Sequence, residues 1–356
     1  MNRAVLFLLL LVLSVASETI KVSGNRGIDI QMAVNMADEG DTVLIPKGDY
    51  VFDESVVISR RVFIKGEGTE KSKVFRSIHA ENSFWFFRVD GKTASSVRIS
   101  GLAFFGDSSV RSPGILLDNG VVDFRVDNCL FEGCSNRAVK VRGGGRGVID
   151  NNSFINNWPT AVVVFGTGEQ AWEGDLRLGG ENAVFVEDNY FEQSDVPNIH
   201  MAHHIASNNG SKYVFRYNTI NDGDMASHAI DAHGNKFYWP RGSRSYEIYG
   251  NKIYAGHRWA GINIRGGDGV IFNNRFYGSF VSPVHLMHES RDGDGECSYP
   301  CEDQIRKLYM WDNYYNDEEV KVHVRHPHII EKNRDFKLNK HSDYEPFTYP
   351  HPLTVE

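Results

Sequence analysis

The sequence contains few cysteines, no excess of basic residues and almost no helical periodicity. Its four cysteines are not spaced as the four ligands of a zinc site, so no zinc site is expected. The net charge of -8 at pH 7 does not favour nucleic-acid binding, and it favours a polyanionic partner only if positive charge is concentrated locally. Convincing helical periodicity occurs once, from Ile28 to Glu39. We therefore expect a chain built mainly from strands.

The long hydrophobic run lies at the beginning of the chain. Residues 1–17 combine an early Arg3, an apolar run from Ala4 and small residues at Ala16 and Ser17, a pattern typical of a secretory signal peptide. An uncleaved membrane anchor is the alternative, but the run is short and weakly flanked for a membrane span. We expect the mature protein to be secreted or periplasmic, with no membrane segment.

The sequence is rich in a repeat in which an asparagine is followed two positions later by an aromatic or apolar residue. The residue three positions before each asparagine is also apolar, as Ile271 is before Asn274. Successive copies lie 23 to 39 residues apart. Repeats of this length, rich in β-branched residues, glycine and asparagine, predict short strands that stack as the coils of a β-solenoid. The repeated asparagines are Asn152, Asn189, Asn218, Asn251, Asn274 and Asn313.

This pattern resembles the single-stranded right-handed parallel β-helix of the pectate-lyase-like superfamily. In that superfamily stacked asparagines occupy one turn of each coil, and an amphipathic helix followed by a GDTV segment opens the fold. Here residues 40–50 read GDTVLIPKGDY. The resemblance implies an all-β chain with a cap at 18–40, the β-helix at 41–318, and a final strand with a covering tail at 319–356. We expect a monomer.

The candidate site is formed by the outward side chains of one strand in each coil. Strand alternation places two columns of residues on this face. Long loops beside it carry aromatic and arginine side chains, which is how a rigid scaffold builds a sugar-binding groove. The resemblance also places the active site on this face. One column is Lys140, Val163, Asp231, Asn263 and His285; the other is Arg142, Phe165, His233, Arg265 and Met287; His204 is expected to face outward nearby.

Cleavage of a uronic-acid polymer by β-elimination suits these side chains. The reaction needs a cation for the carboxylate, a base for the adjacent proton and an acid for the leaving oxygen. We predict that Arg265 binds the carboxylate, that His233 transfers the proton, and that Asp231 orients His233. Lys212 and Tyr213 are alternative acids or bases. The predicted substrate-binding residues are Asn263, His285, His204, Arg244, Arg241, Trp239, Lys140 and Arg142.

The segment from Ser207 to Gly234 resembles alginate-lyase and chondroitinase-B-type β-helix lyases. Those enzymes carry a lysine in an SNKS stretch and an RHG sequence one coil later. Here Lys212 is displaced, and Ala232 stands where the arginine would be. The acidic calcium-binding cluster of pectate lyases is not evident. No cofactor is therefore predicted, with Ca²⁺ kept as an option, and the expected partner is a polysaccharide, preferably acidic.

Two other classes of protein remain open. A β-helix glycoside hydrolase would need two opposed carboxylates, whereas the outward columns contain Asp231 alone. A non-catalytic solenoid that binds glycans or serves a surface structure needs no catalytic group.

The cysteines divide into two pairs. Cys297 and Cys301 bracket Ser-Tyr-Pro in an acidic loop, and a disulfide is the default state for loop cysteines in an exported protein. Cys129 falls at an asparagine position of the repeat, so it is expected to be buried.

Overall fold

The structure is a computed structural model that describes residues 17–80, 83–107, 110–194, 203–236 and 239–355. The predicted signal peptide falls on residues 1–17, of which 1–16 lie outside the described residues. Among the described residues, no helix is long and apolar enough to span a membrane.

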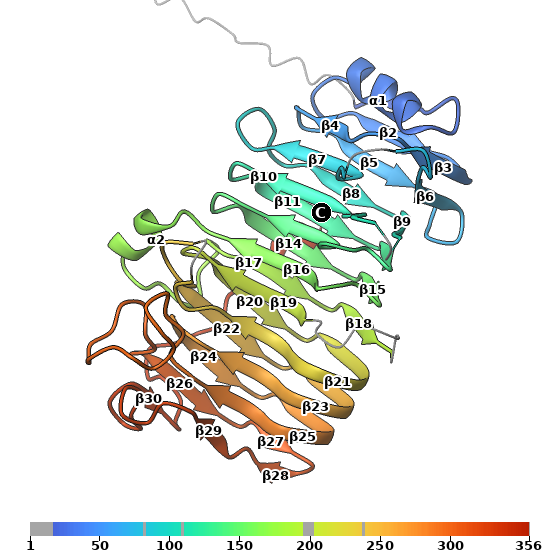
Figure 1. The fold of residues 1–356 in the computed structure, drawn as a ribbon. Coiled ribbons are helices and arrows are strands. Elements are labelled where there is room, and N and C mark those ends of the chain that lie inside the picture. Colours follow the sequence, from blue (N-terminus) through green and yellow to red (C-terminus); the bar gives the residue numbers. More distant parts are fainter. Residues whose placement is uncertain (1–16, 81–82, 108–109, 195–202, 237–238, 356) are drawn as a thin grey trace, which may run out of the picture.

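The chain winds into a parallel β-helix whose coils each contribute strands to three long faces (Figure 1). The second face is a 12-stranded sheet. Its strands are β1 (Thr19–Lys21), β2 (Thr42–Ile45), β5 (Phe63–Gly66), β8 (Arg98–Ser100), β11 (Val122–Asp127), β14 (Arg146–Asp150), β17 (Val184–Glu187), β20 (Lys212–Arg216), β22 (Ser245–Tyr249), β24 (Asp268–Phe272), β26 (Leu308–Trp311) and β30 (Phe336–Lys337).

The first and third faces are joined because three long strands pass through both of them. These strands are β21 (Thr219–Ala232), β23 (Lys252–Ile264) and β25 (Arg275–Leu286). The third face begins with β3 (Gly48–Phe52), β6 (Ser72–Arg76), β9 (Ala103–Phe105), β12 (Leu130–Glu132), β15 (Ser153–Ile155) and β18 (Tyr190–Gln193), and it ends with β27 (Tyr314–Tyr315) and the antiparallel β28 (Glu318–Glu319).

The first face carries the two predicted outward columns, and we call its outer surface the site face. Its strands are β4 (Val56–Ile58), β7 (Phe87–Asp90), β10 (Ile115–Asp118), β13 (Val139–Val141), β16 (Thr160–Phe165), β19 (His203–Asn208), the carboxyl-terminal parts of β21, β23 and β25, and β29 (Val322–Val324).

The strand register confirms the first predicted column. Lys140 pairs with Val163, which pairs with Ala206. Ile205 pairs with Ile230, so Ala206 lies beside Asp231. Asp231 is then followed by Asn263, His285 and His323 in successive coils.

The interior is filled by the same kind of stacking. The rings of Phe104, Phe131, Phe154 and Phe191 lie nearly parallel, with centroids 4.8, 5.0 and 4.7 Å apart. This spacing equals the distance between neighbouring strands in a sheet, about 4.8 Å. Identical residues at one position of the repeat therefore stack without a gap. Cys129 and Cys134 are buried free thiols in this core, as expected for Cys129.

The repeated asparagines form a ladder in the turn before the third face. The side-chain Nδ2 of Asn218 donates to the carbonyl of Val186 in the preceding coil, at 2.9 Å. The Oδ1 of Asn251 in the next coil accepts from the backbone N–H of Asn218, also at 2.9 Å. Each amide thus satisfies backbone groups that the turn would otherwise leave buried and unpaired.

The N-terminal end and part of the second face of the solenoid are covered. Helix α1 (Gly27–Met36) packs Ile30, Ala33 and Val34 onto the first coil, where an open end would expose the core. The C-terminal tail turns back along the second face and ends in the short helix η1 (Pro352–Thr354). Arg216, which is fully buried, bonds Glu187, Tyr249 and the tail carbonyls of Phe347 and Thr348. Arg216, Glu187 and Tyr249 therefore form a structural stack under the tail.

We expect Asn251→Ala to lower the free energy of unfolding by about 1–3 kcal/mol, because it removes the acceptor of two buried N–H groups of Asn218 in the preceding turn. Thermal or urea denaturation measures the loss. Asn221→Ala is the matched control, since Asn221 is exposed and its side chain bonds only a tyrosine hydroxyl in the described residues. Equal stability of the two variants would contradict a structural ladder.

Candidate functional site

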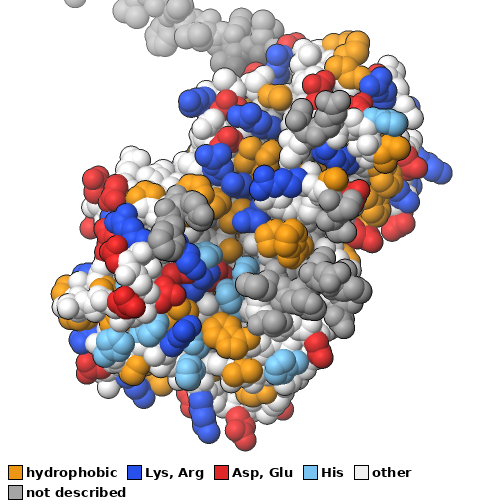
Figure 2. Space-filling model, viewed as in Figure 1, with side chains coloured by type: hydrophobic (Ala, Val, Ile, Leu, Met, Phe, Trp, Pro, Cys, Tyr) orange, Lys and Arg blue, Asp and Glu red, His pale blue; other side chains and the backbone are white. Residues whose placement is uncertain are grey.

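The site face changes character along the solenoid axis. Figure 2 shows Lys and Arg side chains gathered over the strands around β10, with His and acidic side chains gathered nearer β19 and β21. From the N-terminal coils toward the C-terminal coils, the site face presents a basic patch, an apolar patch and a histidine–carboxylate cluster.

The basic patch consists of five cations around β10 and β13. Asp118 is the carboxylate that faces them, 3.6 Å from both Arg88 and Arg142. Both arginine side chains are about half exposed. At this distance and exposure, a single carboxylate neutralises little of the surrounding charge. The patch is Arg88, Arg111, Arg137, Lys140 and Arg142.

Lys140 lies at the centre of this patch. Burial and the positive charges of Arg142 and Arg137 together lower its pKa to about 8, against a smaller opposing effect of Asp118. Its ammonium group lies 4.9 Å from the centre of the Phe165 ring. At pH 7 about a tenth of Lys140 is therefore uncharged, far more than of an ordinary surface lysine.

The apolar patch lies beside the basic patch. Val163, Phe165 and Ala206 form it, and Trp239 packs over Phe165 with ring centres 4.5 Å apart. Phe165 is only 8% exposed, so the partly exposed Trp239 is the aromatic side chain here that can meet the apolar face of a sugar ring. The predicted placement of Trp239 beside the site face thus agrees with the structure.

The histidine–carboxylate cluster is built around two buried carboxylates, Asp231 and Glu289. Arg265 donates from Nε to Asp231 Oδ1 at 2.9 Å, and its two terminal nitrogens bond Asp231 and Glu289. His233 places Nδ1 2.8 Å from Glu289 Oε2 and Nε2 3.0 Å from Asp231 Oδ2. Lys236 adds a further ion pair to Glu289.

The charges in this cluster stabilise one another. Burial alone would raise the pKa of Asp231, but Arg265, His233 and His228 hold it well below its usual range. Burial likewise opposes ionisation of Glu289, yet His233 and Arg265 lower its pKa to about 2. Burial lowers the pKa of His233, whereas Asp231 and Glu289 raise it, and the net direction is upward. The cluster is thus a network of mutually satisfied ions.

These contacts overturn the predicted roles of Arg265 and His233. The guanidinium of Arg265 is 8% exposed and already binds two carboxylates, so it is not available to a substrate carboxylate. Both ring nitrogens of His233 contact carboxylates, so neither is free to accept a substrate proton. Asp231 does contact His233 directly, as the sequence analysis anticipated for an orienting residue.

Further along the face, neutral histidines gather. His285 places Nδ1 2.8 Å from Asn263 Oδ1 and packs against the ring of Trp259. Burial and the nearby His323 lower the pKa of His285 to about 4. His285 and Asn263 hold each other in place, and His285 is only 2% exposed, so it offers little surface to a ligand.

His203 and His228 stack nearer the cluster, with ring centres 4.2 Å apart. Their nitrogens and an Asp231 oxygen lie within 4.8 Å of one another, a spacing that could hold a metal ion. The Asp231 oxygens, however, are already bonded to Arg265, so a cation at this point would meet a positive guanidinium. The donor set therefore does not fit a divalent ion.

Two further predictions are corrected by burial. His204 does not face outward; it is 3% exposed and bonds Asp222, which also pairs with Arg258. Tyr213 points into the core and is 1% exposed, and burial raises its pKa well above the usual value. A buried phenol with a raised pKa cannot serve as the predicted acid or base at the surface.

Arg241 and Arg244 lie at the edge of the second face rather than on the site face. Arg241 bonds Asp303 and Glu169, while Arg244 pairs with Asp268 at 3.2 Å. Both guanidinium groups lie over the ring of Trp172. Their predicted role in substrate binding is therefore replaced by a role in anchoring the loops.

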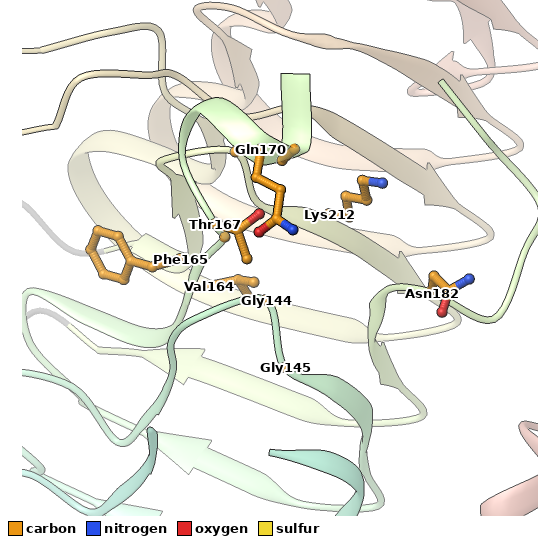
Figure 3. Close-up of a pocket in the computed structure, with 11 residues that line it drawn as sticks. Gly144, Gly145, Val164, Phe165, Thr167, Gln170, Asn182 and Lys212 are labelled. Atoms are coloured by element: carbon orange, nitrogen blue, oxygen red, sulfur yellow. The ribbon is translucent and has the colours of Figure 1, made fainter. Parts of the chain in front are cut away.

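Lys212 lies in a separate pocket of about 250 Å³ beside the short helix α2 (Glu169–Glu173). Figure 3 shows Lys212 and Gln170 on one side of the strand, with the ring of Phe165 pointing away from them. Burial and Arg244 lower the pKa of Lys212. This pocket is separate from the histidine–carboxylate cluster. Lys212 therefore does not lie near His233, where it was predicted to serve as an alternative acid or base.

The sequence analysis missed several residues that the structure brings to the site face. Glu289 and Lys236 lie in loops, outside the strand alternation that identified the two columns. Arg88 lies in β7, whose coil departs from the asparagine repeat, and Arg137 precedes β13. Extending the column of Lys140 toward the N-terminus could have identified Arg88. Lys140 pairs with Leu116 in the preceding coil, and Leu116 pairs with Arg88.

The sequence matches the family described as "Right handed beta helix region" over residues 88–291, which is more than half of the chain. The chain therefore belongs to this family, and the predicted right-handed parallel β-helix is confirmed.

Curated relatives share only part of this chain. SHC SH2 domain-binding protein 1 from Homo sapiens is 26% identical over 179 residues, covering 50% of this chain and 25% of that protein. The Mus musculus protein of the same name is 24% identical over 182 residues, covering 51% and 26%. The match thus spans about a quarter of the length of these relatives.

Among solved structures, an alginate lyase from Paenibacillus sp. str. FPU-7 superposes with a TM-score of 0.54 at 14% sequence identity. The superposition covers 87% of this chain and 99% of that one. At this identity the likeness shows the shared fold.

We expect Arg265→Ala to lower the free energy of unfolding by about 3–5 kcal/mol, because two buried carboxylates lose their shared cation. Arg142→Ala, on the same face but half exposed, should change it by at most about 1 kcal/mol. Denaturant unfolding of both variants measures the difference. Similar losses in the two would show that the cluster is not the buried ionic network described above.

Proposed function

We propose that this chain binds an acidic polysaccharide along the site face and cleaves it by β-elimination. The observation that carries the proposal is the basic patch, in which five cations gather around Asp118, with Asp90 in the neighbouring coil also near Arg88. The chain as a whole is acidic, so a local surplus of positive charge on an exposed surface favours a negatively charged ligand.

The basic patch contains the two kinds of group that β-elimination needs side by side. Arg142 and Arg88 are exposed guanidiniums that can bind the carboxylate of a uronic acid in bidentate fashion. Lys140 lies between the arginines of the patch and has a lowered pKa, as a catalytic lysine requires. In the histidine–carboxylate cluster, by contrast, the corresponding groups are bonded to one another.

The arginines neutralise the carboxylate, which acidifies the hydrogen on the adjacent carbon. Neutral Lys140 takes that proton, the electron pair forms a carbon–carbon double bond, and the bond to the neighbouring glycosidic oxygen breaks. The Lys140 ammonium then returns the proton to the departing oxygen, which leaves as a hydroxyl group.

The apolar patch gives the polymer a second point of contact. Phe165 and Trp239 lie one coil and more beyond Lys140, and coils are about 4.8 Å apart. A neighbouring sugar ring can pack on the partly exposed ring of Trp239, which Phe165 supports from below, while its charged neighbour lies on the basic patch. The polymer would therefore run along the solenoid axis.

A hydrolase fits the geometry less well. Inverting or retaining hydrolysis uses two carboxyl groups that reach the substrate. Asp231 and Glu289 are fully buried and ion-paired, so neither reaches a bound sugar.

The proposal also includes a location outside the cytoplasm and action as a monomer, and both rest on the sequence alone.

Incubation with alginate, pectate and glycosaminoglycans tests the activity. Ultraviolet absorbance from unsaturated uronate supports the proposal. New reducing ends without that absorbance indicate hydrolysis, and retention without products indicates binding only.

On a substrate that the wild type cleaves, Lys140→Met should reduce kcat by at least about 100-fold, the usual contribution of a general base. Lys252→Met is the matched control, since Lys252 is exposed on the third face.

Arg142→Ala should raise KM as well as lower kcat, because it removes a cation that binds substrate and transition state. His233→Gln should retain turnover in its folded fraction. If His233→Gln is inactive and Lys140→Met active, the proton transfer belongs to His233.

The pH dependence follows from the state of Lys140. Its base form is the deprotonated one, so the rate should rise with pH and level off above about pH 8. Initial rates between about pH 6 and pH 9, at substrate concentrations well below KM, measure this profile. A rate that falls across this range, in protein that stays folded, would exclude Lys140 as the base.

A further inference from the structure

A second cluster of reactive side chains lies just beyond the site face, in the loop after β25. His288 follows the last residues of β25, and Cys297 and Cys301 lie in the acidic loop that comes next. The donor atoms of these three residues lie within 4.8 Å of one another. His288 and Cys301 are nearly inaccessible to solvent, at 1% and 3% exposure.

The environment of His288 is that of a metal-ligating histidine. Its ring nitrogens lie 3.7 Å from Cys297 Sγ. The ring also bonds the backbone of Glu302, and its own backbone N–H donates to His326 Nδ1 at 3.1 Å. Metal-bound histidines are commonly oriented by such a backbone partner.

The distances suit a tetrahedral zinc ion. With Zn–S near 2.3 Å and Zn–N near 2.05 Å, two ligand atoms at the tetrahedral angle lie about 3.6 Å apart. The observed sulfur–nitrogen separation of 3.7 Å is close to this value. In the present structure, however, Cys297 and Cys301 form a disulfide, with Cα atoms 5.9 Å apart. The sulfurs can bind a metal only after that bond is broken.

We propose that reduction of the Cys297–Cys301 disulfide creates a binding site for one Zn²⁺ ion, held by His288, Cys297 and Cys301. A thiol or phosphine reductant supplies two electrons, the sulfur–sulfur bond breaks and each sulfur takes up a proton. Binding of Zn²⁺ then releases these two protons as the thiolates coordinate the ion. Three protein ligands leave a fourth position for water or another donor.

This site is independent of the proposed lyase activity, since it shares no residue with the basic patch. It does lie beside the histidine–carboxylate cluster, because Glu289 follows His288 directly. A bound ion would therefore hold the loop that delivers Glu289 to Arg265 and His233.

The test compares one protein in two redox states. Purified protein is reduced with a phosphine, freed of reductant without oxygen, and mixed with Zn²⁺ or Co²⁺. We expect one metal per chain after gel filtration, and for Co²⁺ the absorption bands of thiolate-to-cobalt charge transfer and tetrahedral geometry. The oxidised protein should bind at least about 100-fold more weakly, because two ligands are lost. Equal binding in both states, or no cobalt–thiolate band after reduction, would overturn the proposal.

Variants locate the ion within the reduced protein. His288→Gln and Cys297→Ser should each weaken binding by about 10–100-fold or more. His328→Gln is the control, because His328 is an exposed histidine that bonds the same loop at Gly295 but lies outside the donor cluster. If His288→Gln does not fold, the redox comparison of the wild-type protein still decides the question. Unchanged binding in folded Cys297→Ser would refute the assignment.

Discussion

Parallel pairing of each coil with the next, at a spacing of about 4.8 Å, is the constraint on which the rest of this structure depends. Because the register is kept from coil to coil, every position of the repeat becomes a column in space. Phenylalanines stack in the interior and asparagines stack in a turn, each amide bonding the backbone of neighbouring coils. The same register also aligns the outward residues of the first face. The strand pairing that stabilises the fold therefore also positions the side chains of the candidate site.

Burial then decides what the charges on that face can do. Asp231, Glu289 and Arg265 are withdrawn from solvent, and with the partly exposed His233 they remain charged because they bond one another. Around Lys140, Arg88 and Arg142 stay about half exposed and share little negative charge. The first group behaves as part of the scaffold, whereas the second retains the capacity to bind an anion. The net charge of -8 for the whole chain does not reveal this difference between the ion-paired cluster and the basic patch.

Loops account for most of the differences between the predicted and observed sites. Arg241 and Arg244 were placed near the groove by the length of their loop, but ion pairs with Asp303 and Asp268 draw them to the second face. Glu289 is the converse case, since its loop carries it to Arg265 and His233 with no periodicity to indicate that position. His204 could not be phased because its strand follows residues that do not fit the repeat, and it is buried against Asp222.

The β-helix, the asparagine ladder and the column of Lys140, Asp231, Asn263 and His285 could be predicted from the sequence. These features depend on repeat period and strand alternation, which are local properties of the chain. Which charges are free could not be predicted, because ion pairing depends on residues distant in sequence: Arg265 is 34 residues from Asp231 and 24 from Glu289. The fold likewise brings His288 to the two cysteines. A repeat specifies where side chains stack, whereas the folded loops specify which partners they meet.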